Sequence, residues 1–271
     1  MTKNPQARLI LGENLDVLKA LLERPSPRFR LVYLDPPFDT GVNWKTREGV
    51  QAYRDQFRGD AFLEMMDERL RLVRQLLTED GSLFLHCDFR RAPHLQLLCD
   101  DIFGPGARES AKAPGFRNEI IWSYGLGGSS PRYYPRKHDN LYWYTKSSNW
   151  VFDPPRVPAT SQRLKGKLKK APDTWNIPTL NNMAAERTGY PTQKPLALLD
   201  RIVGAHSEPG DWVGDFFCGS GTSLHSALRL GRNAFGCDAS EVAIQQTADR
   251  LNAAGFACLT EKSTEFGDPG V

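Results

Sequence analysis

The sequence predicts an α/β fold built around a mostly parallel β-sheet. First, short β-rich runs alternate with helical patterns over residues 1–104 and again after Pro195. Second, residues 29–34, FRLVYL, are apolar through most of their length, as expected of a strand covered on both faces. Third, the 271-residue chain is 40% hydrophobic and 25% charged, which is typical of a globular protein large enough to bury a sizeable core.

The N-terminal part of the chain supplies the first strand–helix units. Its clearest helix is predicted at 60–78, where Asp60 is expected to cap the N-terminus and Gly81 to end the unit. One face of this helix is apolar at helical spacing, with Phe62, Met66, Leu70, Val73 and Leu77. Strands are predicted at 8–13, 29–34 and 82–87, and two further helices at 15–23 and 93–103. This alternation predicts parallel strands joined by right-handed crossovers.

Residues 105–194 have a different composition. They contain ten prolines, and β-like runs at 119–124 and 141–145 interrupt what is otherwise predicted to be loops or a small insertion. The net charge of the whole chain is +3, but residues 1–104 carry −1, residues 105–194 carry +9 and residues 195–271 carry −5. A concentrated positive charge is the footprint expected for binding a phosphate backbone.

The α/β pattern resumes in the C-terminal part. Strands are predicted at 211–217 and 233–238. Helices are predicted at 195–206, with proline at the first position, at 221–230, closed by Gly231, and from the Ser240 cap to Gly255. We expect the final dozen residues to be frayed.

Several classes of protein are excluded by composition. No apolar run approaches the roughly 18 residues of a membrane span, and the start lacks the pattern of a signal peptide. The five cysteines form no CxxC pair, so neither a zinc ribbon nor a disulfide framework is indicated. We therefore expect a cytoplasmic protein with no metal and no membrane partner.

A glycine-rich turn, VGDFFCGSGTS at 213–223, joins a predicted strand to a predicted helix. Gly219 and Gly221 allow the backbone to approach a ligand closely, and the helix start offers free N–H groups. A plain βα turn is the alternative, and a phosphate-binding loop is excluded because no Gly-Lys-Ser/Thr follows. Asp238 ends the next strand, where an acidic side chain suits ribose hydroxyls. The turn therefore favours a nucleoside-containing ligand.

A second motif, LVYLDPPFDTG at 31–41, follows a buried strand. The carboxylate of Asp35 and the carbonyl of Pro36 are both acceptors, and a primary aromatic amine has two hydrogens to offer them. Pro36 and Pro37 stiffen the backbone, and Phe38 supplies a flat face for a base. The alternative is a rigid Pro-Pro turn capped by an aspartate. In addition, His86 and Cys87 end a strand near this site, where we expect packing rather than metal binding.

These motifs are similar to those of the S-adenosylmethionine-dependent amino-methyltransferases of DNA. DPPF at 35–38 and FCGSGT at 217–222 resemble the catalytic and cofactor motifs, and YPTQKP at 190–195 resembles the segment that holds the methionine end of the cofactor. Their order, with the basic region between them, resembles the β class. LGENL at 11–15, IFGPG at 102–106 and TWNIP at 174–178 fit the same pattern. The resemblance runs from about residue 8 to residue 254.

The resemblance implies a Rossmann-like methyltransferase fold with a circularly permuted motif order. Residues 1–104 and 190–256 would form the catalytic and cofactor-binding domain, 105–189 an inserted target-recognition region, and 257–271 a C-terminal tail. It assigns catalysis to Asp35, Pro36, Pro37 and Phe38. It assigns binding of S-adenosylmethionine to Glu13, Asp35, Thr192, Lys194, Asp215, Phe217, Gly219, Gly221 and Asp238. Glu13, Phe216 and Asp39 depart from the usual Asp, Pro and Asn.

The implied reaction is methyl transfer to the exocyclic amino group of a flipped base in double-stranded DNA. N6 of adenine is favoured over N4 of cytosine, because the family's cytosine enzymes more often carry Ser in place of Asp35. Cytosine C5 methylation is excluded because no cysteine follows a proline. Phosphate contacts are expected from Arg163, Lys165, Lys167, Lys169 and Lys170. Base contacts are expected from Arg132, Tyr133, Tyr134, Arg136 and Lys137, although solvated loops remain the alternative.

Two other functions stay open at this point. Methyltransferases of RNA or protein glutamine tend to use Asn-Pro-Pro-Tyr after their glycine motif, and both Asp35 and the reversed order speak against them. A catalytically silent DNA-binding protein is disfavoured by the intact DPPF and glycine motifs. A cognate restriction endonuclease and a homodimer remain open as partners.

Overall fold

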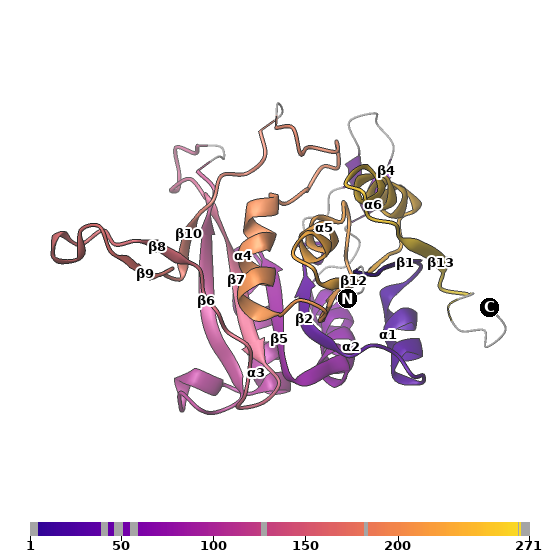
Figure 1. Cartoon of the computed structure of the whole chain (residues 1–271), viewed down its shortest axis with the longest axis horizontal. Coiled ribbons are helices and arrows are strands. Elements are labelled where there is room, and N and C mark those ends of the chain that lie inside the picture. Colours follow the sequence, from indigo (N-terminus) through magenta and orange to yellow (C-terminus); the bar gives the residue numbers. More distant parts are fainter. Residues whose placement is uncertain are drawn as a thin grey trace.

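The computed structural model describes residues 5–38, 43–45, 51–54, 59–125, 129–181, 184–264 and 266. A nine-stranded sheet runs through the molecule (Figure 1). In spatial order its strands are β10 (Thr174–Asn176), β6 (Gly115–Ser123), β7 (His138–Thr145), β5 (Leu77–Cys87), β2 (Phe29–Leu34), β11 (Trp212–Asp215), β12 (Asn233–Asp238), β1 (Ala7–Leu11) and β13 (Leu259–Lys262). β7 is antiparallel to both of its neighbours, and the other pairs are parallel. The predicted α/β class with a mostly parallel sheet is confirmed.

Helices cover both faces of this sheet (Figure 1). One layer consists of α1 (Asn14–Leu22), α2 (Asp60–Leu76) and α3 (Ala92–Phe103), and the other of α4 (Leu196–His206), α5 (Thr222–Arg229) and α6 (Glu241–Ala253). β2 contributes to both cores, because successive residues of a strand point to opposite faces. Val32 and Leu34 pack in the core with α1, α2 and α3, whereas Leu31 and Tyr33 pack in the core with α4 and α5.

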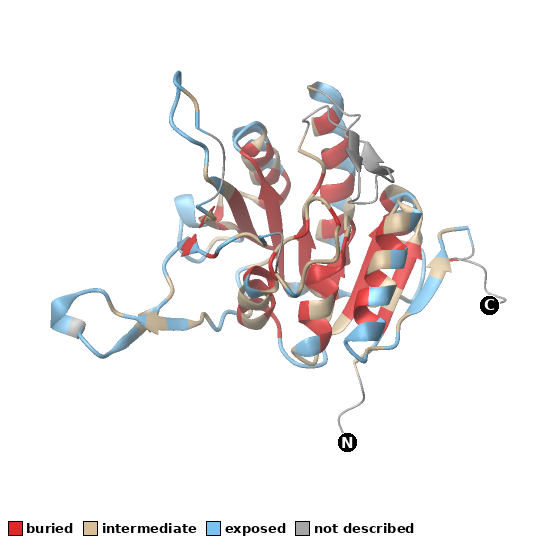
Figure 2. Ribbon diagram, turned by 90° about the horizontal axis from the view of Figure 1, so that it is seen from above, coloured by how far each residue is buried: buried red, intermediate tan, exposed pale blue. Residues whose placement is uncertain are grey.

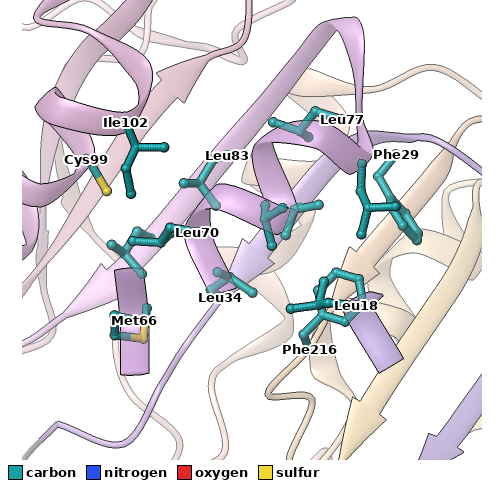
Figure 3. Close-up of a cluster of buried hydrophobic side chains, with 14 of the residues drawn as sticks. Leu18, Phe29, Leu34, Met66, Leu70, Leu77, Leu83, Cys99, Ile102 and Phe216 are labelled. Carbon is teal, nitrogen blue, oxygen red and sulfur yellow. The ribbon is translucent and has the colours of Figure 1, made fainter. Parts of the chain in front are cut away.

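The core between the sheet and α1–α3 is drawn in Figure 3. Met66 and Leu70 of α2 lie there among Leu34 of β2 and Leu83 of β5. The sequence spacing predicted this apolar face of α2, and Phe62, Met66, Leu70 and Val73 are fully buried. Burial of the central strands from both sides, seen in Figure 2, explains why β2 reads as an almost unbroken apolar run.

The position of the functional site follows from the strand order. The chain passes from β2 to β5 on one side and from β11 to β12 on the other, so the sheet has its switch point between β2 and β11, which pair directly. In open α/β sheets, ligands bind outside the carboxyl ends of the strands at such a point. DPPF follows β2 and the glycine turn follows β11. The topology therefore brings together two motifs that are far apart in the sequence.

Two predictions about helix ends were wrong. Asp60 is the first residue of α2 and does not cap it, because the cap position is held by Gly59 and no side chain there accepts a cap hydrogen bond. Gly81 lies within β5, which already begins at Leu77, because Leu77 pairs with Phe29 of β2 and extends the ladder. Ser240 does cap α6, its side chain accepting a hydrogen bond from the Ala243 N–H.

The tail is also more ordered at its start than we expected. β13 adds to the edge strand β1 in parallel, and Arg8 Nη2 lies 2.7 Å from Glu261 Oε2 across the pair. An edge strand offers a row of unpaired N–H and C=O groups, which explains why residues 259–262 pair there.

Part of the region assigned to an insertion belongs to the main sheet. β6, β7 and β10 extend it, and Trp122 and Trp143 on these strands are buried. The β6–β7 connection and a hairpin of β8 (Arg156–Pro158) and β9 (Leu168–Lys170) are among the parts of this region that lie outside the sheet. This hairpin, residues 156–170, projects away from the body in both Figure 1 and Figure 2, and we call it the basic arm.

The remaining short elements are η1 (Gly106–Arg108), η2 (Gln162–Leu164) and the antiparallel pair β3 (Asn43–Lys45) and β4 (Gln51–Arg54). Asp39, which departs from the family pattern, lies outside the described residues, as does most of the segment 39–59 that follows DPPF.

Candidate active site

Asp35 is the first residue after β2 and lies at the switch point. Its Oδ2 atom is 2.5 Å from Nζ of Lys194, and its Oδ1 atom is 3.7 Å from Nδ1 of His86. The Asp35 and Lys194 side chains are 17% and 12% exposed, so this ion pair is shielded but can be reached from outside. The fold thus joins the DPPF motif to the YPTQKP segment, across 159 positions of sequence.

The three residues after Asp35 line the same place. Pro36 is buried, and Pro37 and Phe38 are half-buried. The Phe38 ring lies 5.7 Å from the imidazole of His86, and Nζ of Lys194 lies 5.4 Å from the centre of the Phe38 ring. A flat aromatic face and a carboxylate therefore stand side by side at the end of β2.

The glycine turn holds its shape through side chains of α6 and the YPTQKP segment. Gly219 and Gly221 have φ values of 49° and 68°, which an L side chain rarely adopts. A Cβ atom on Gly221 would lie 2.5 Å from Cγ2 of Thr247, and one on Gly219 would lie 3.1 Å from the Tyr190 ring. Thr247 Oγ1 also donates to the Gly219 carbonyl at 2.9 Å. Close packing, in addition to the positive φ values, therefore explains why glycine occupies both positions.

Replacing Gly221 with alanine is expected to lower the free energy of unfolding by about 1–3 kcal/mol, since backbone strain and a clash with Thr247 add together. It should also weaken cofactor binding by displacing the turn. Gly255→Ala is the matched control, because φ there is 83° but no atom lies within 4 Å of the added Cβ. Chemical denaturation would measure the free energy of unfolding, and calorimetric titration would measure cofactor affinity. Equal losses of stability in the two variants would rule out the contact with Thr247 as a cause.

Carboxylates end three neighbouring strands around this turn. Asp215 ends β11 and accepts hydrogen bonds from Phe217 N, at 3.0 Å, and from the Ser223 hydroxyl. Asp238 ends β12 and accepts from Gly219 N and Ser240 N, each at 2.9 Å. Glu13 follows β1 with its side chain 63% exposed and 3.4 Å from Nη2 of Arg69. Acceptors at strand ends suit a ligand that carries hydroxyl donors and positive charge.

Burial raises the pKa of Asp215 to about 7, although hydrogen bonds from Ser223 and Phe217 oppose the rise. The folded protein therefore keeps a proton on this group that the unfolded chain loses above about pH 4. The contribution of Asp215 to stability falls as pH rises from 4 to 7 and is constant above that range.

Asp215→Asn should therefore gain stability relative to the wild type between pH 4 and pH 7, with roughly 4 kcal/mol as the ceiling. Denaturation curves at half-unit pH steps would measure the difference. The exposed Asp249→Asn serves as control and should give a flat difference. A flat difference for Asp215→Asn as well would contradict the raised pKa.

The YPTQKP segment is fastened on two sides. Gln193 is buried, accepts from the Thr188 N–H at 2.7 Å and donates to the Glu186 carbonyl at 2.6 Å. The Thr222 hydroxyl, at the start of α5, donates to the Lys194 carbonyl at 3.1 Å and accepts from Nη1 of Arg250 at 2.6 Å. These bonds fix the backbone around Lys194, whose ammonium group contacts Asp35, and Thr192 is half-buried.

The sequence did not indicate which polar groups His86 contacts. The expected packing is present, since His86 is fully buried, but the structure also places its imidazole between Asp35 and Asp139. Tyr33 and Asp139 were not singled out at all, and both contact the ring. The position of His86 near the end of its strand could have indicated this contact. The ends of neighbouring parallel strands lie side by side, and Asp35 follows the strand that pairs with β5.

The two basic clusters lie on separate protrusions. Arg163, Lys165, Lys167 and Lys170 are exposed on the basic arm, and Lys169 is half-buried. Arg132, Tyr133, Arg136 and Lys137 lie on the β6–β7 connection. Arg136 is held there between the rings of Phe89 and Tyr133, at 4.0 and 4.3 Å, and Tyr134 is 93% exposed. The basic charge is therefore presented outward from the sheet edge that carries β6 and β10.

The residues present fit S-adenosylmethionine chemically. Asp238 and Glu13 carry acceptors that would suit ribose and adenine donors, Asp35 carries negative charge that would suit a cationic centre, and Lys194 carries the positive charge that would suit a carboxylate. The two glycines leave the backbone open, since side chains there would meet Tyr190 and Thr247.

Comparison with known proteins identifies the family of this chain. The sequence profile of the N6/N4 methyltransferases, a DNA methylase family, matches residues 29–249, and the chain belongs to this family. It is thus an S-adenosylmethionine-dependent DNA methyltransferase that acts on N6 of adenine or N4 of cytosine. The resemblance of the sequence to the DNA amino-methyltransferases is confirmed, whereas its place in the β class stays a prediction.

Relatives include restriction-modification enzymes. The type II methyltransferase M.EcaI of Enterobacter cloacae is 27% identical over 290 residues, covering 82% of this chain, which spans only 64% of that relative. The DNA adenine methyltransferase YhdJ of Escherichia coli (strain K12) is 26% identical over 275 residues, covering 95% of this chain and 87% of the relative. The crystal structure of the M1.HpyAVI–SAM complex has the same fold, with a TM-score of 0.64 at 20% identity over 91% of this chain and all of that one.

Among the described helices of this chain, none is long and apolar enough to cross a membrane.

Proposed function

We propose that this enzyme methylates N6 of adenine at a specific site in double-stranded DNA, with N4 of cytosine as the alternative. The observation that supports this proposal is the location of Asp35 and Phe38 together at the end of β2, which pairs with β11, the strand before the glycine turn. An aspartate at this position is the feature by which the adenine enzymes of the family tend to differ from the cytosine enzymes.

Catalysis would depend on hydrogen bonds to the amino group. The lone pair of an exocyclic amine is delocalised into the base, which makes the nitrogen a poor nucleophile. Acceptance of its two hydrogens by the Asp35 carboxylate and the Pro36 carbonyl favours a tetrahedral nitrogen whose lone pair points outward. S-adenosylmethionine, when bound, supplies an electrophilic methyl group for in-line displacement. Positioning and electrostatics then carry the reaction, and no covalent enzyme intermediate is needed.

The target base must leave the helix to reach Asp35. Phe38 would stack on the flipped base, which is worth about 1–3 kcal/mol. Phe38 suits this role because its ring is only half-buried and is backed by His86 on one side.

Binding of the cofactor would use the residues around the glycine turn. Asp238 would accept from the ribose, Glu13 would lie near the adenine, and Lys194 with Thr192 would face the carboxylate. Asp215, Phe217, Gly219 and Gly221 would line the wall of the site.

Recognition of DNA would fall to the two protrusions of residues 105–189. Residues 1–104 and 190–256 would supply catalysis and cofactor binding, with the strands β6, β7 and β10 as the base on which the protrusions stand. The support is the location of the positive charge, since the exposed lysines and arginines of the basic arm lie outside the sheet.

Mass spectrometry of nucleosides tests the target base. Plasmid DNA from methylation-deficient cells expressing the wild-type chain should contain N6-methyladenine, and DNA from cells expressing Asp35→Ala should not. Finding N4-methylcytosine instead would select the alternative, and finding neither would refute the proposal. Sequencing that maps methylated positions would then give the recognition site.

A further inference from the structure

The imidazole of His86 lies between two carboxylates behind the catalytic loop. It is fully buried at the end of β5, with Nδ1 facing Asp35 Oδ1 at 3.7 Å and Nε2 facing Asp139 Oδ2 at 3.2 Å. The Tyr33 hydroxyl lies 2.8 Å from Nδ1. The rings of Phe38 and Trp122 pack against it at 5.7 and 5.5 Å, so the imidazole is held in one orientation.

The groups around this ring determine which nitrogen carries its hydrogen. Burial alone would raise the pKa of Asp139, but a hydrogen bond from His86, the charge of Lys194 and a hydrogen bond from Tyr124 lower it overall. Asp139 is therefore an anion that only accepts, and Nε2 of His86 must be the donor to it. With the hydrogen on Nε2, Nδ1 is the acceptor of the ring, and the Tyr33 hydroxyl donates to it. Burial, and then the charge of Asp35, raise the pKa of Tyr33 well above its usual value, so this hydroxyl keeps its hydrogen.

This tautomer matters for Asp35. With its hydrogen on Nε2, His86 presents no N–H toward Oδ1 of Asp35, and Lys194 occupies only Oδ2. Oδ1 therefore keeps its capacity to accept. In the opposite tautomer, an N–H on Nδ1 would donate to the Tyr33 oxygen at 2.8 Å, and its positive end would also lie near Oδ1 of Asp35, which would make Oδ1 a weaker acceptor for any other donor.

We infer that Asp139 is a positioning residue that acts through His86. By holding the imidazole in the Nε2–H tautomer, it keeps Oδ1 of Asp35 available for the amino hydrogen of the target base. The inference rests on the proposed function, in which Asp35 accepts that hydrogen.

Nuclear magnetic resonance tests the tautomer without reference to catalysis. In wild-type protein with ¹⁵N-labelled histidine, the His86 signals, identified by their loss in His86→Phe, should be those of the Nε2–H form. In the wild type, the Tyr124 hydroxyl donates to Oδ1 of Asp139 at 3.3 Å. In Asp139→Asn, this donor favours the amide orientation in which the oxygen faces Tyr124 and the NH₂ group faces Nε2 of His86. The signals should then change to those of the Nδ1–H form. A wild-type spectrum of the Nδ1–H form would overturn the inference even if Asp139→Asn does not fold.

A double-mutant cycle tests the consequence for the reaction. Asp139→Asn should lower the single-turnover methylation rate by up to about tenfold, the factor for one full hydrogen bond, with the affinity for S-adenosylmethionine unchanged. In the His86→Phe background, which has no N–H to compete, the same substitution should change the rate little. Equal losses in both backgrounds would overturn the role of His86. The exposed Asp173→Asn is the control and should leave the rate unchanged.

These outcomes are distinguishable from failure of the proposed function. If the wild type transfers no methyl group to either base, the proposed function fails, while the spectra still decide the tautomer. If it methylates DNA but the spectra and the cycle disagree with expectation, only the inference fails.

Discussion

Asp35→Ala is expected to reduce the single-turnover rate of methyl transfer by about 10²–10³-fold or more, while S-adenosylmethionine still binds. The carboxylate lies at the switch point between β2 and β11, and without it only one acceptor remains for the two amino hydrogens. Rapid-quench assays with radiolabelled cofactor would measure the rate, and calorimetry would measure cofactor affinity.

The exposed Asp249→Ala is the control for this substitution, because it removes the same charge from α6. Loss of Asp35 leaves the ammonium of Lys194 without its 2.5 Å partner, so a modest change in cofactor affinity is compatible with the assignment. Retention of more than a tenth of the wild-type rate would remove Asp35 from its proposed role.

Removing charge from the tip of the basic arm is expected to have the second-largest effect. Replacement of Arg163, Lys165 and Lys167 by glutamine should weaken DNA binding by about 10²-fold at 0.1 M salt, and should lower the slope of log affinity against log salt by up to about three. These side chains are exposed and stand away from the sheet, so the fold and cofactor binding should be unaffected.

A triple variant of Lys19, Arg28 and Lys262 removes the same number of exposed charges from other surfaces. Fluorescence anisotropy with a labelled duplex, measured over a range of salt concentrations, would compare the two proteins. Equal losses of affinity would mean that only the overall charge matters, and the arm would then have no specific part in DNA binding.

The sequence alone determined the fold class and the two motifs. Strand β2 was predicted with its observed bounds and α2 to within two residues, because burial on one or two faces imposes a local periodicity that can be read from the residues. Turn chemistry is local as well, which is why the helix caps at Ser240 and the glycines at 219 and 221 were predicted.

Local signals failed where pairing partners came from elsewhere. The β-like runs that form β6 and β7 lie in a proline-rich, basic stretch that resembles an insertion, yet β7 pairs with β5 and β6 pairs with β7, so both strands belong to the main sheet. The start of the tail was assigned to frayed chain, but the open edge of β1 pairs with it. Such pairing depends on a surface that other segments build, so composition could not predict it.

Only the tertiary structure decided how the site is built. Asp35 meets Lys194 across 159 positions and His86 meets Asp139 across 53, and no sequence spacing encodes either contact. The raised pKa of Asp215 likewise exists only because packing removes water from a carboxylate that would ionise freely in an unfolded chain. Motif residues can be recognised one by one, but their charges and hydrogen bonds depend on neighbours that folding alone brings within a few ångströms.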